Sequence, residues 1–366
     1  MSTSFGWGPS TLDSRLSTVD SRLTVRIAYL LESTELFGGV KVALLQAEAL
    51  ARRGHRVAVV SPQPPPDWFS LMQAHFERST FRDSREIAAA DVRVATFWRT
   101  VPPALEGARG PVFHLCQGYE GEITFYRDAW SEIDRIYREP TIKLAVSATL
   151  AARLSGLGIG PVVDVGQAFD PDGFFPGESR PPAKPPWILV VGPLEIDFKG
   201  VDVALAGLDV WRRRGGRFRL RRVSYFPAGE AEKGWGLADE YHHRLPPDRM
   251  PYVYRASDLF IGASRLAEGF GLPSLEAVAC GVPSLLSDVP GQREIAGEAA
   301  GYFRDGDPAS LADQLPALLT EEARARARFL GPAAAARFDA KRVAERLEQA
   351  FRDALGDGRP LGPPRR

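Results

Sequence analysis

The chain has 366 residues, with 46 basic and 46 acidic side chains that give a formal net charge of zero. Hydrophobic residues make up 44% and charged residues 25% of the sequence, which is ordinary globular composition and excludes a disordered or collagen-like chain. The balanced charge gives no basic field for nucleic acid, and the length predicts two domains.

The first 23 residues carry a repeated polar heptad and lack the basic start and apolar core of a signal peptide, so we expect a flexible leader. No run reaches the ~18 apolar residues of a membrane span. The two cysteines, Cys116 and Cys280, lie far apart in apolar runs and indicate a reducing compartment. We therefore predict a cytoplasmic protein, and the inner face of the membrane stays open as a second location.

Regular structure is expected from the apolar, β-rich run at 25–31, which is typical of a strand buried on both faces. Phe37-Gly-Gly-Val40 follows, and then a run with helical spacing that Gly54 closes. With a strand at 56–60, this is a βαβ unit. We expect further strands at 92–97, 112–116 and 142–146 and a helix at 123–138.

Prolines gather between residues 170 and 187, which predicts an interdomain linker. A second alternation follows, with expected strands at 187–191, 218–223, 259–262 and 283–287 and expected helices at 200–214, 273–280, 311–319 and 335–355. Two such alternations predict two doubly wound α/β domains that face a cleft, with ligands beyond the carboxyl ends of the strands. We place the domains at 24–180 and 187–334, a helix that crosses back to the N-terminal domain at 335–355, and a flexible tail at 356–366.

The stretch from Glu268 to Glu276, Glu-Gly-Phe-Gly-Leu-Pro-Ser-Leu-Glu, carries the clearest chemical pattern. Its two glycines leave backbone amides uncovered, and Pro273 suits the first position of a helix. Amides at a helix N-terminus favour anions. Two carboxylates beside an anion site make sense if they accept hydrogen bonds from hydroxyl groups that flank a diphosphate. A capped helix with solvated glutamates is the alternative.

This spacing of Glu268 and Glu276 resembles the EX7E signature of the GT4-type retaining glycosyltransferases (group 1 glycosyltransferases), which have the two-domain GT-B fold. Further segments resemble the same family, and the resemblance is strongest in the C-terminal half: Phe37–Val40, Gly166–Asp170, Val190–Gly192 with Lys199-Gly200, Tyr254–Ile261, Ala279–Pro283 and Pro290–Ile295. The resemblance implies the GT-B fold, two Rossmann-like domains facing a cleft.

The resemblance also implies roles for individual residues. Glu268 and Lys199 would be catalytic, with Glu268 contacting the transferred sugar and Lys199 neutralising the departing diphosphate. Glu276 would hold the ribose hydroxyls. The other residues implied in donor binding are Phe270, Gly271, Leu272, Gly38 and Gly39.

The implied activity is transfer of a sugar from a nucleotide-diphosphate donor to a carbohydrate or glycolipid acceptor, with retention, in surface polysaccharide or glycoconjugate synthesis. No metal and no other cofactor is expected, since Lys199 and the helix amides can neutralise the diphosphate. Two alternatives stay open. One is a non-catalytic or weakly hydrolytic protein that binds nucleotide sugars, and the other is a nucleotide-sugar epimerase with the GT-B fold.

Two departures from the family pattern bear on activity. The family usually carries an arginine directly after Gly192, and this chain has Pro193 there. Arg221 and Arg222, on a neighbouring strand, could supply the missing guanidinium group, or they could be solvated arginines at the edge of that strand.

The second departure is the absence of the loop histidine that the family often has on the N-terminal side of the cleft. Gln117 and Glu120 fall in that loop, and we expect them to line the acceptor side of the cleft, with His114 behind them in its strand. The Gln-Gly-Tyr-Glu run resembles family members that act on surface polysaccharides. The pair His242-His243 lacks further ligands at metal-site spacing, so we expect no zinc.

A partly amphipathic aromatic stretch follows Pro64-Pro-Pro66 and includes Trp68, Phe69, Met72 and Phe76. Two explanations stay open for it. It forms a helix that packs on the core, or it makes a peripheral contact with a membrane that carries a lipid-linked acceptor.

Overall fold

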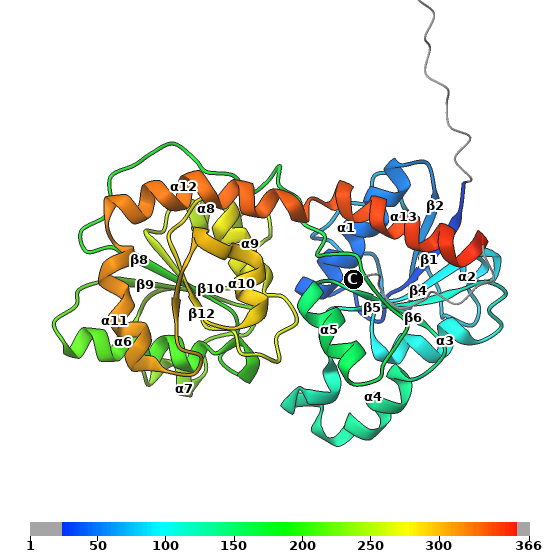
Figure 1. Cartoon of the computed structure of the whole chain (residues 1–366), viewed down its shortest axis with the longest axis horizontal. Coiled ribbons are helices and arrows are strands. Elements are labelled where there is room, and N and C mark those ends of the chain that lie inside the picture. Colours follow the sequence, from blue (N-terminus) through cyan, green and yellow to red (C-terminus); the bar gives the residue numbers. More distant parts are fainter. Residues whose placement is uncertain (1–23, 357–366) are drawn as a thin grey trace, which may run out of the picture.

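The computed structural model describes residues 24–356, which form two α/β domains that lie side by side (Figure 1). The predicted leader (1–23) and all but the first residue of the predicted tail (356–366) lie outside the described residues.

The N-terminal domain is a seven-stranded parallel sheet with the strand order β3-β2-β1-β4-β5-β6-β7. Its strands are β1 (Arg26–Leu30), β2 (Arg56–Ser61), β3 (His75–Arg78), β4 (Val92–Ala95), β5 (Val112–Cys116), β6 (Ile142–Ala145) and β7 (Val162–Asp164). Its helices are α1 (Gly38–Arg52), α2 (Arg85–Ala89), α3 (Val101–Leu105), α4 (Trp130–Tyr137) and α5 (Ala148–Gly156).

The C-terminal domain is a six-stranded parallel sheet with the order β10-β9-β8-β11-β12-β13. Its strands are β8 (Trp187–Val191), β9 (Arg219–Ser224), β10 (Ala238–His243), β11 (Leu259–Gly262), β12 (Ser284–Ser287) and β13 (Gly301–Phe303). Its helices are α6 (Val201–Arg213), α7 (Glu230–Lys233), α8 (Met250–Arg255), α9 (Leu272–Ala279), α10 (Pro290–Ala296), α11 (Pro308–Leu318) and α12 (Glu321–Ala335).

Both sheets reverse their strand order next to their first strand, between β1 and β4 and between β8 and β11. Loops diverge at such a switch point, so the carboxyl ends of these strands are the expected place for a ligand. The strands read as apolar runs because helices bury both faces of a parallel sheet; all but the first residue of β1 and every residue of β11 are buried. The doubly wound α/β architecture predicted from the two alternations is confirmed.

The chain crosses between the domains twice, once through the proline-rich segment before β8 and once after α12. The last helix, α13 (Ala340–Gly356), lies on the N-terminal domain, whereas α12 lies on the C-terminal domain (Figure 1). The ring of Phe351 in α13 packs against that of Phe113 in β5, with centroids 4.8 Å apart. The single helix predicted at 335–355 is wrong at its start, because the chain forms two helices separated by residues 336–339.

Other local predictions also differ from the structure. The aromatic stretch that includes Trp68 forms no helix and ends in the strand β3. The indole Nε1 of Trp68 donates to the carbonyl of Thr34 at 2.9 Å. The helix predicted at 123–138 begins as a 3₁₀ segment (Thr124–Ala129) and is α-helical only from Trp130. Within residues 24–356, no helix is long and apolar enough to cross a bilayer.

Candidate active site

A glycine-rich loop joins β11 to α9 at the carboxyl end of the C-terminal sheet. Gly271 begins the helix with a φ of +97°, and a Cβ at this position would lie 2.6 Å from Nε2 of Gln292, so only glycine fits. Among the described residues, no acceptor is found for the backbone amides of Phe270, Gly271 and Leu272. Three open amides at a helix N-terminus form a place where an anion is favoured.

Glu268 and Lys199 lie next to this loop and contact each other through Oε1 and Nζ. They line a hollow of about 300 Å³ at the carboxyl ends of β8 and β11, part of which is open to solvent. The Glu268 side chain is 7% exposed, and its second oxygen, Oε2, is buried with no hydrogen-bond partner among the described residues. A buried carboxylate oxygen without a donor is rare in proteins and marks a place for a ligand.

Lys199 reaches this position because the backbone after it bends sharply. Gly200 has a φ of +61°, and a Cβ there would lie 1.9 Å from the carbonyl oxygen of Ala263. The absence of a side chain lets the Lys199 turn approach the end of β11. Gly192 has a φ of +126°, which favours glycine, and the Lys199 methylenes pack against it.

Glu276 lies one turn into α9 and is nearly buried, but both of its oxygens are already occupied. Oε1 accepts from Nζ of Lys41 in α1 at 2.8 Å, and Oε2 accepts from the hydroxyl of Tyr254 in α8 at 3.0 Å. No role was predicted from the sequence for Lys41 or Tyr254. Two sequence features could have indicated them: Lys41 lies two residues after the glycine pair, and Tyr254 lies in a segment that resembles the family.

The remaining predicted donor and cleft residues meet at a narrow seam between the domains. Gln117 donates from Nε2 to the carbonyl of Gly39 at 2.9 Å. A Cβ on Gly38 would lie 3.2 Å from Leu272, and a Cβ on Gly269 would lie 1.9 Å from the carbonyl oxygen of Gln117. The glycines allow the two backbones to approach each other, and Gln117 stands at the seam.

A second contact joins the domains beside this seam. The carboxylate of Glu294 in α10 accepts from the amides of Ala148 and Thr149 at 3.0 and 3.1 Å, at the N-terminus of α5. The Ser147 hydroxyl donates to the carbonyl of Gly269 at 3.3 Å. A carboxylate at a helix N-terminus is stabilising, so these contacts favour the closed arrangement of the two domains.

Glu120 is half-buried in the loop after β5, whereas His114 is buried in β5 itself. Glu120 accepts a hydrogen bond from the Tyr137 hydroxyl, and burial raises the pKa of its carboxyl to about 7. His114 is 1% exposed in β5, packs against the Tyr137 ring at 4.7 Å, and burial lowers its pKa to about 3. We therefore leave His114 out of any direct contact with an acceptor.

Neither arginine that was considered as a replacement for the missing cation reaches the hollow. Arg222 is fully buried and donates to the carbonyls of Val190 and Gly192 at 2.6 and 2.7 Å, with Glu232 as its ion-pair partner at 2.5 Å. Arg221 pairs with Glu240. Arg222 thus stabilises the end of β8 before Pro193. Neither Arg221 nor Arg222 supplies a guanidinium group to the hollow. The alternative of solvated arginines fails for both, because both are buried.

A family model described as "Glycosyl transferases group 1" matches residues 185–321 of this chain, which include Lys199, Glu268 and Glu276. Over nearly its whole length the chain is similar to the phosphatidyl-myo-inositol mannosyltransferase of Mycobacterium tuberculosis. The two are 25% identical over 369 residues, which cover 89% of this chain and 96% of that protein.

Solved structures with the GT-B fold match almost the whole chain. Sucrose-phosphate synthase from Thermosynechococcus elongatus matches with a TM-score of 0.72 and 17% identity, over 89% of this chain and 98% of that one. Anabaena Alr3699/HepE in complex with UDP-glucose matches with a TM-score of 0.69 and 15% identity, over 90% of this chain and 100% of that one.

Proposed function

We propose that this chain, which is a group 1 glycosyltransferase with the GT-B fold, transfers a hexosyl group from a nucleoside-diphosphate sugar to a carbohydrate or lipid-linked acceptor. The configuration at the anomeric carbon is retained. One observation carries the proposal: the buried oxygen Oε2 of Glu268 has no donor among the described residues and lies beside a lysine and a row of open amides.

The open groups suit the charges that form during glycosyl transfer. Departure of the diphosphate develops negative charge on the leaving group, and fixed donors aimed at that charge lower the barrier. Lys199 and the amides of residues 270–272 are such donors. We propose that they neutralise the diphosphate without a divalent cation, while Glu268 accepts a hydrogen bond from a hydroxyl of the transferred sugar.

We propose that donor binding rearranges the contacts of Glu276. In the role proposed for it, its carboxylate accepts hydrogen bonds from the ribose hydroxyls, but Lys41 and Tyr254 now occupy both oxygens. We propose that Lys41 leaves when the nucleotide enters, which requires the domains to separate at the seam beside Gly38 and Gly39. The same seam, with Gln117, then closes over the donor.

The acceptor side of the proposal rests on the relatives. The mycobacterial relative is named for a phospholipid acceptor, phosphatidyl-myo-inositol, and for transfer of mannose. The same transferase name supports transfer over epimerisation or simple binding. A lipid-linked acceptor would bring the N-terminal domain to the surface of a membrane, and we propose this peripheral location for the protein during turnover.

The test is a screen of UDP- and GDP-linked hexoses, with release of the nucleoside diphosphate measured in the presence and absence of sugar and glycolipid acceptors. We expect Lys199→Gln to lower the turnover number by at least about 100-fold, as loss of a donor at a developing charge does. Glu268→Gln should also lower it strongly, because the carboxylate that accepts from the sugar hydroxyl is lost. Glu298→Gln is the matched control, because Glu298 is exposed on the same domain. Release of nucleotide that is equally fast in all four proteins would refute the proposal.

A further inference from the structure

A second hollow lies at the opposite edge of the C-terminal sheet, where β8, β11 and β12 begin. Because the strands are parallel, their amino ends lie away from Glu268 and the open amides. The hollow has about 370 Å³ of empty space, part of which is open solvent. Four segments line it: the proline-rich linker at 177–180, the end of α8 at 255–257, the turn at 281–283, and α12.

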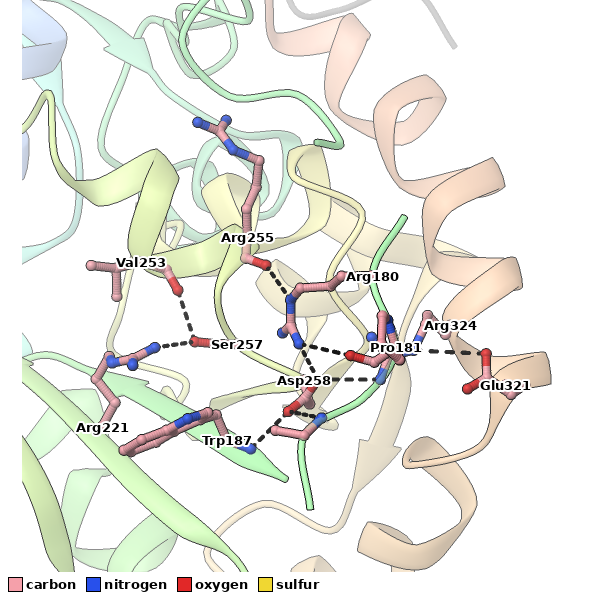
Figure 2. Close-up of polar contacts among 11 residues, drawn as sticks. Arg180, Pro181, Trp187, Arg221, Val253, Arg255, Ser257, Asp258, Glu321 and Arg324 are labelled. Carbon is pink, nitrogen blue, oxygen red and sulfur yellow. Dashed lines mark hydrogen bonds and ion pairs between the residues drawn. The ribbon is translucent and has the colours of Figure 1, made fainter. Parts of the chain in front are cut away.

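Arginines dominate the lining of this hollow, which we call the arginine pocket. Arg180 enters from the linker, and Arg324 and Arg328 enter from α12. Arg255 lies at its rim, but Figure 2 shows its guanidinium group directed away from the other charges, and that group packs over the Phe175 ring. Three guanidinium groups therefore belong to the pocket itself.

The carboxylate of Asp258, buried beside the pocket, faces these cations and is already saturated. Its side chain is fully buried, and Oδ1 lies 2.9 Å from Nη1 of Arg180 and 3.3 Å from Nη2 of Arg324. Oδ2 accepts from the backbone amides of Trp187 and Ala183 at 2.8 and 3.3 Å. The lining also includes Glu178, which is exposed and forms no ion pair within residues 24–356. Three guanidinium groups thus share one buried carboxylate, and the other two acids at the pocket, Glu178 and Glu321, are exposed to solvent.

Two nitrogens of the pocket confirm that donors are in excess. Nη2 of Arg180 and Nε of Arg324 are buried and have no hydrogen-bond partner among the described residues. The nearest further acid to Arg324 is Glu321, which is 77% exposed and lies 4.0 Å from Nε, so it is too far for a hydrogen bond. Buried guanidinium donors without acceptors are costly, and an anion would satisfy them.

We propose that the arginine pocket binds a small phosphate-type oxyanion, at a site separate from the donor site. A planar guanidinium group presents paired N–H groups that match the oxygens of phosphate. The ligand would be free phosphate, a phosphate ester or the phosphate of a lipid head group, since all three present the same oxygens. The donors come from the linker, which carries Arg180, and from α12, which carries Arg324 and Arg328; Arg328 already donates to the carbonyl of Gly177 at 2.6 Å. A bound anion would tie the linker to α12.

Isothermal titration of the full-length protein with inorganic phosphate tests the site. Arg324→Gln and Arg328→Gln should each weaken binding about tenfold or more, the loss expected for one charge-assisted hydrogen bond. Arg326→Gln is the matched control, because it removes the same charge from an exposed position of the same helix, and should leave binding unchanged. The melting temperatures of the ligand-free variants show whether each one folds.

The variant Lys199→Gln separates this site from the donor site. Phosphate binding that survives Lys199→Gln and is lost in both pocket variants supports the proposal. Binding lost in Lys199→Gln and retained in folded Arg324→Gln and Arg328→Gln, or no binding to the wild type at millimolar phosphate, overturns it. Because none of these outcomes depends on transfer activity, the proposed function can fail while this site stands.

Co-sedimentation with vesicles that contain phosphatidic acid identifies the source of the anion. Sedimentation that requires Arg324 and Arg328 but not Arg326 indicates a lipid head group. Titration by inorganic phosphate without such sedimentation indicates a free phosphate or a phosphate ester.

Discussion

Nζ of Lys41 lies 2.8 Å from Oε1 of Glu276 and joins α1 of one domain to α9 of the other. Both side chains are largely buried, with 17% and 8% of their surfaces exposed. The lysine thereby occupies the carboxylate to which we assign the ribose. Binding of a nucleotide and closure of this ion pair therefore compete for Oε1 of Glu276.

Replacing Lys41 with glutamine should tighten the binding of nucleoside diphosphates, since the ion pair no longer has to break. A partly buried pair contributes about 1 kcal/mol, which corresponds to a roughly fivefold lower Kd by isothermal titration. Arg52→Gln, at an exposed position of the same helix, should bind nucleotide like the wild type. Weaker binding by Lys41→Gln would mean that Lys41 itself contacts the nucleotide.

Adding a methyl group to Gly269 should force the domains apart. The new Cβ would lie 1.9 Å from the carbonyl oxygen of Gln117, and two backbones leave no flexible atom to yield. We expect Gly269→Ala to increase the radius of gyration in solution scattering and to lower turnover at least about tenfold, because the seam can no longer close. The control is Gly291→Ala, whose Cβ would have its nearest neighbours at 3.9 Å. Unchanged scattering with Gly269→Ala would contradict the closed arrangement.

Restoring the family's arginine in place of Pro193 should accelerate transfer. Arg222 holds the preceding strand end from behind but does not reach the hollow, so the diphosphate would meet Lys199 and the loop amides without this extra cation. A guanidinium group at this position should raise the turnover number several-fold, up to about tenfold. Steady-state kinetics of Pro193→Arg checks this, with Leu194→Arg as a neighbouring control. A slower enzyme would show that another group has replaced the missing cation.

Glu120 should give the protein a distinctive dependence of stability on pH. Its carboxyl has a pKa of about 7 in the folded protein, above the ordinary value of 4.5 in the unfolded chain, because it is buried. The folded state therefore binds more protons between these values, and stability falls as the pH rises through this window. Each pKa unit is worth about 1.4 kcal/mol, so the loss is a few kcal/mol at most.

Urea unfolding at pH 5 and pH 8 measures this effect. Glu120→Gln cannot ionise, so its free energy of unfolding should fall less than that of the wild type between the two pH values. The Tyr137 hydrogen bond can form to the glutamine carbonyl, so the variant should fold. Parallel pH profiles of the two proteins would show that Glu120 ionises freely in the folded state.

The buried framework could be predicted from sequence because parallel strands leave a strong apolar signal. The runs at 25–31 and 259–262 became β1 and β11, and the glycine loops after them became the walls of the site. The strands at the edges of the sheets were missed because they carry little of that signal. β10, for example, reads Ala-Asp-Glu-Tyr-His-His, and its polar side chains are tolerated because it lies at the edge of the sheet.

Contacts between side chains that are far apart in the chain could not be predicted from a single sequence. Glu276 was chosen from its spacing to Glu268, but its partner Lys41 lies 235 residues away, and nothing in the local pattern pairs them. Asp258 was noted only within a segment that resembles the family. Its role as the shared counter-ion of Arg180 and Arg324 depends on how the linker and α12 fold over the sheet.

The position of the final helix decides where this protein can be cut to exchange its domains. Phe351 packs on Phe113, and Arg53 donates to Glu348 at 2.8 Å, so the last stretch of polypeptide completes a unit that began with residue 24. That unit is discontinuous along the gene. A chimaera that exchanges domains with a relative needs two cut points, one in the proline-rich segment and one at residues 336–339. A single cut in the proline-rich segment would remove the native α13 and expose Phe113 of β5.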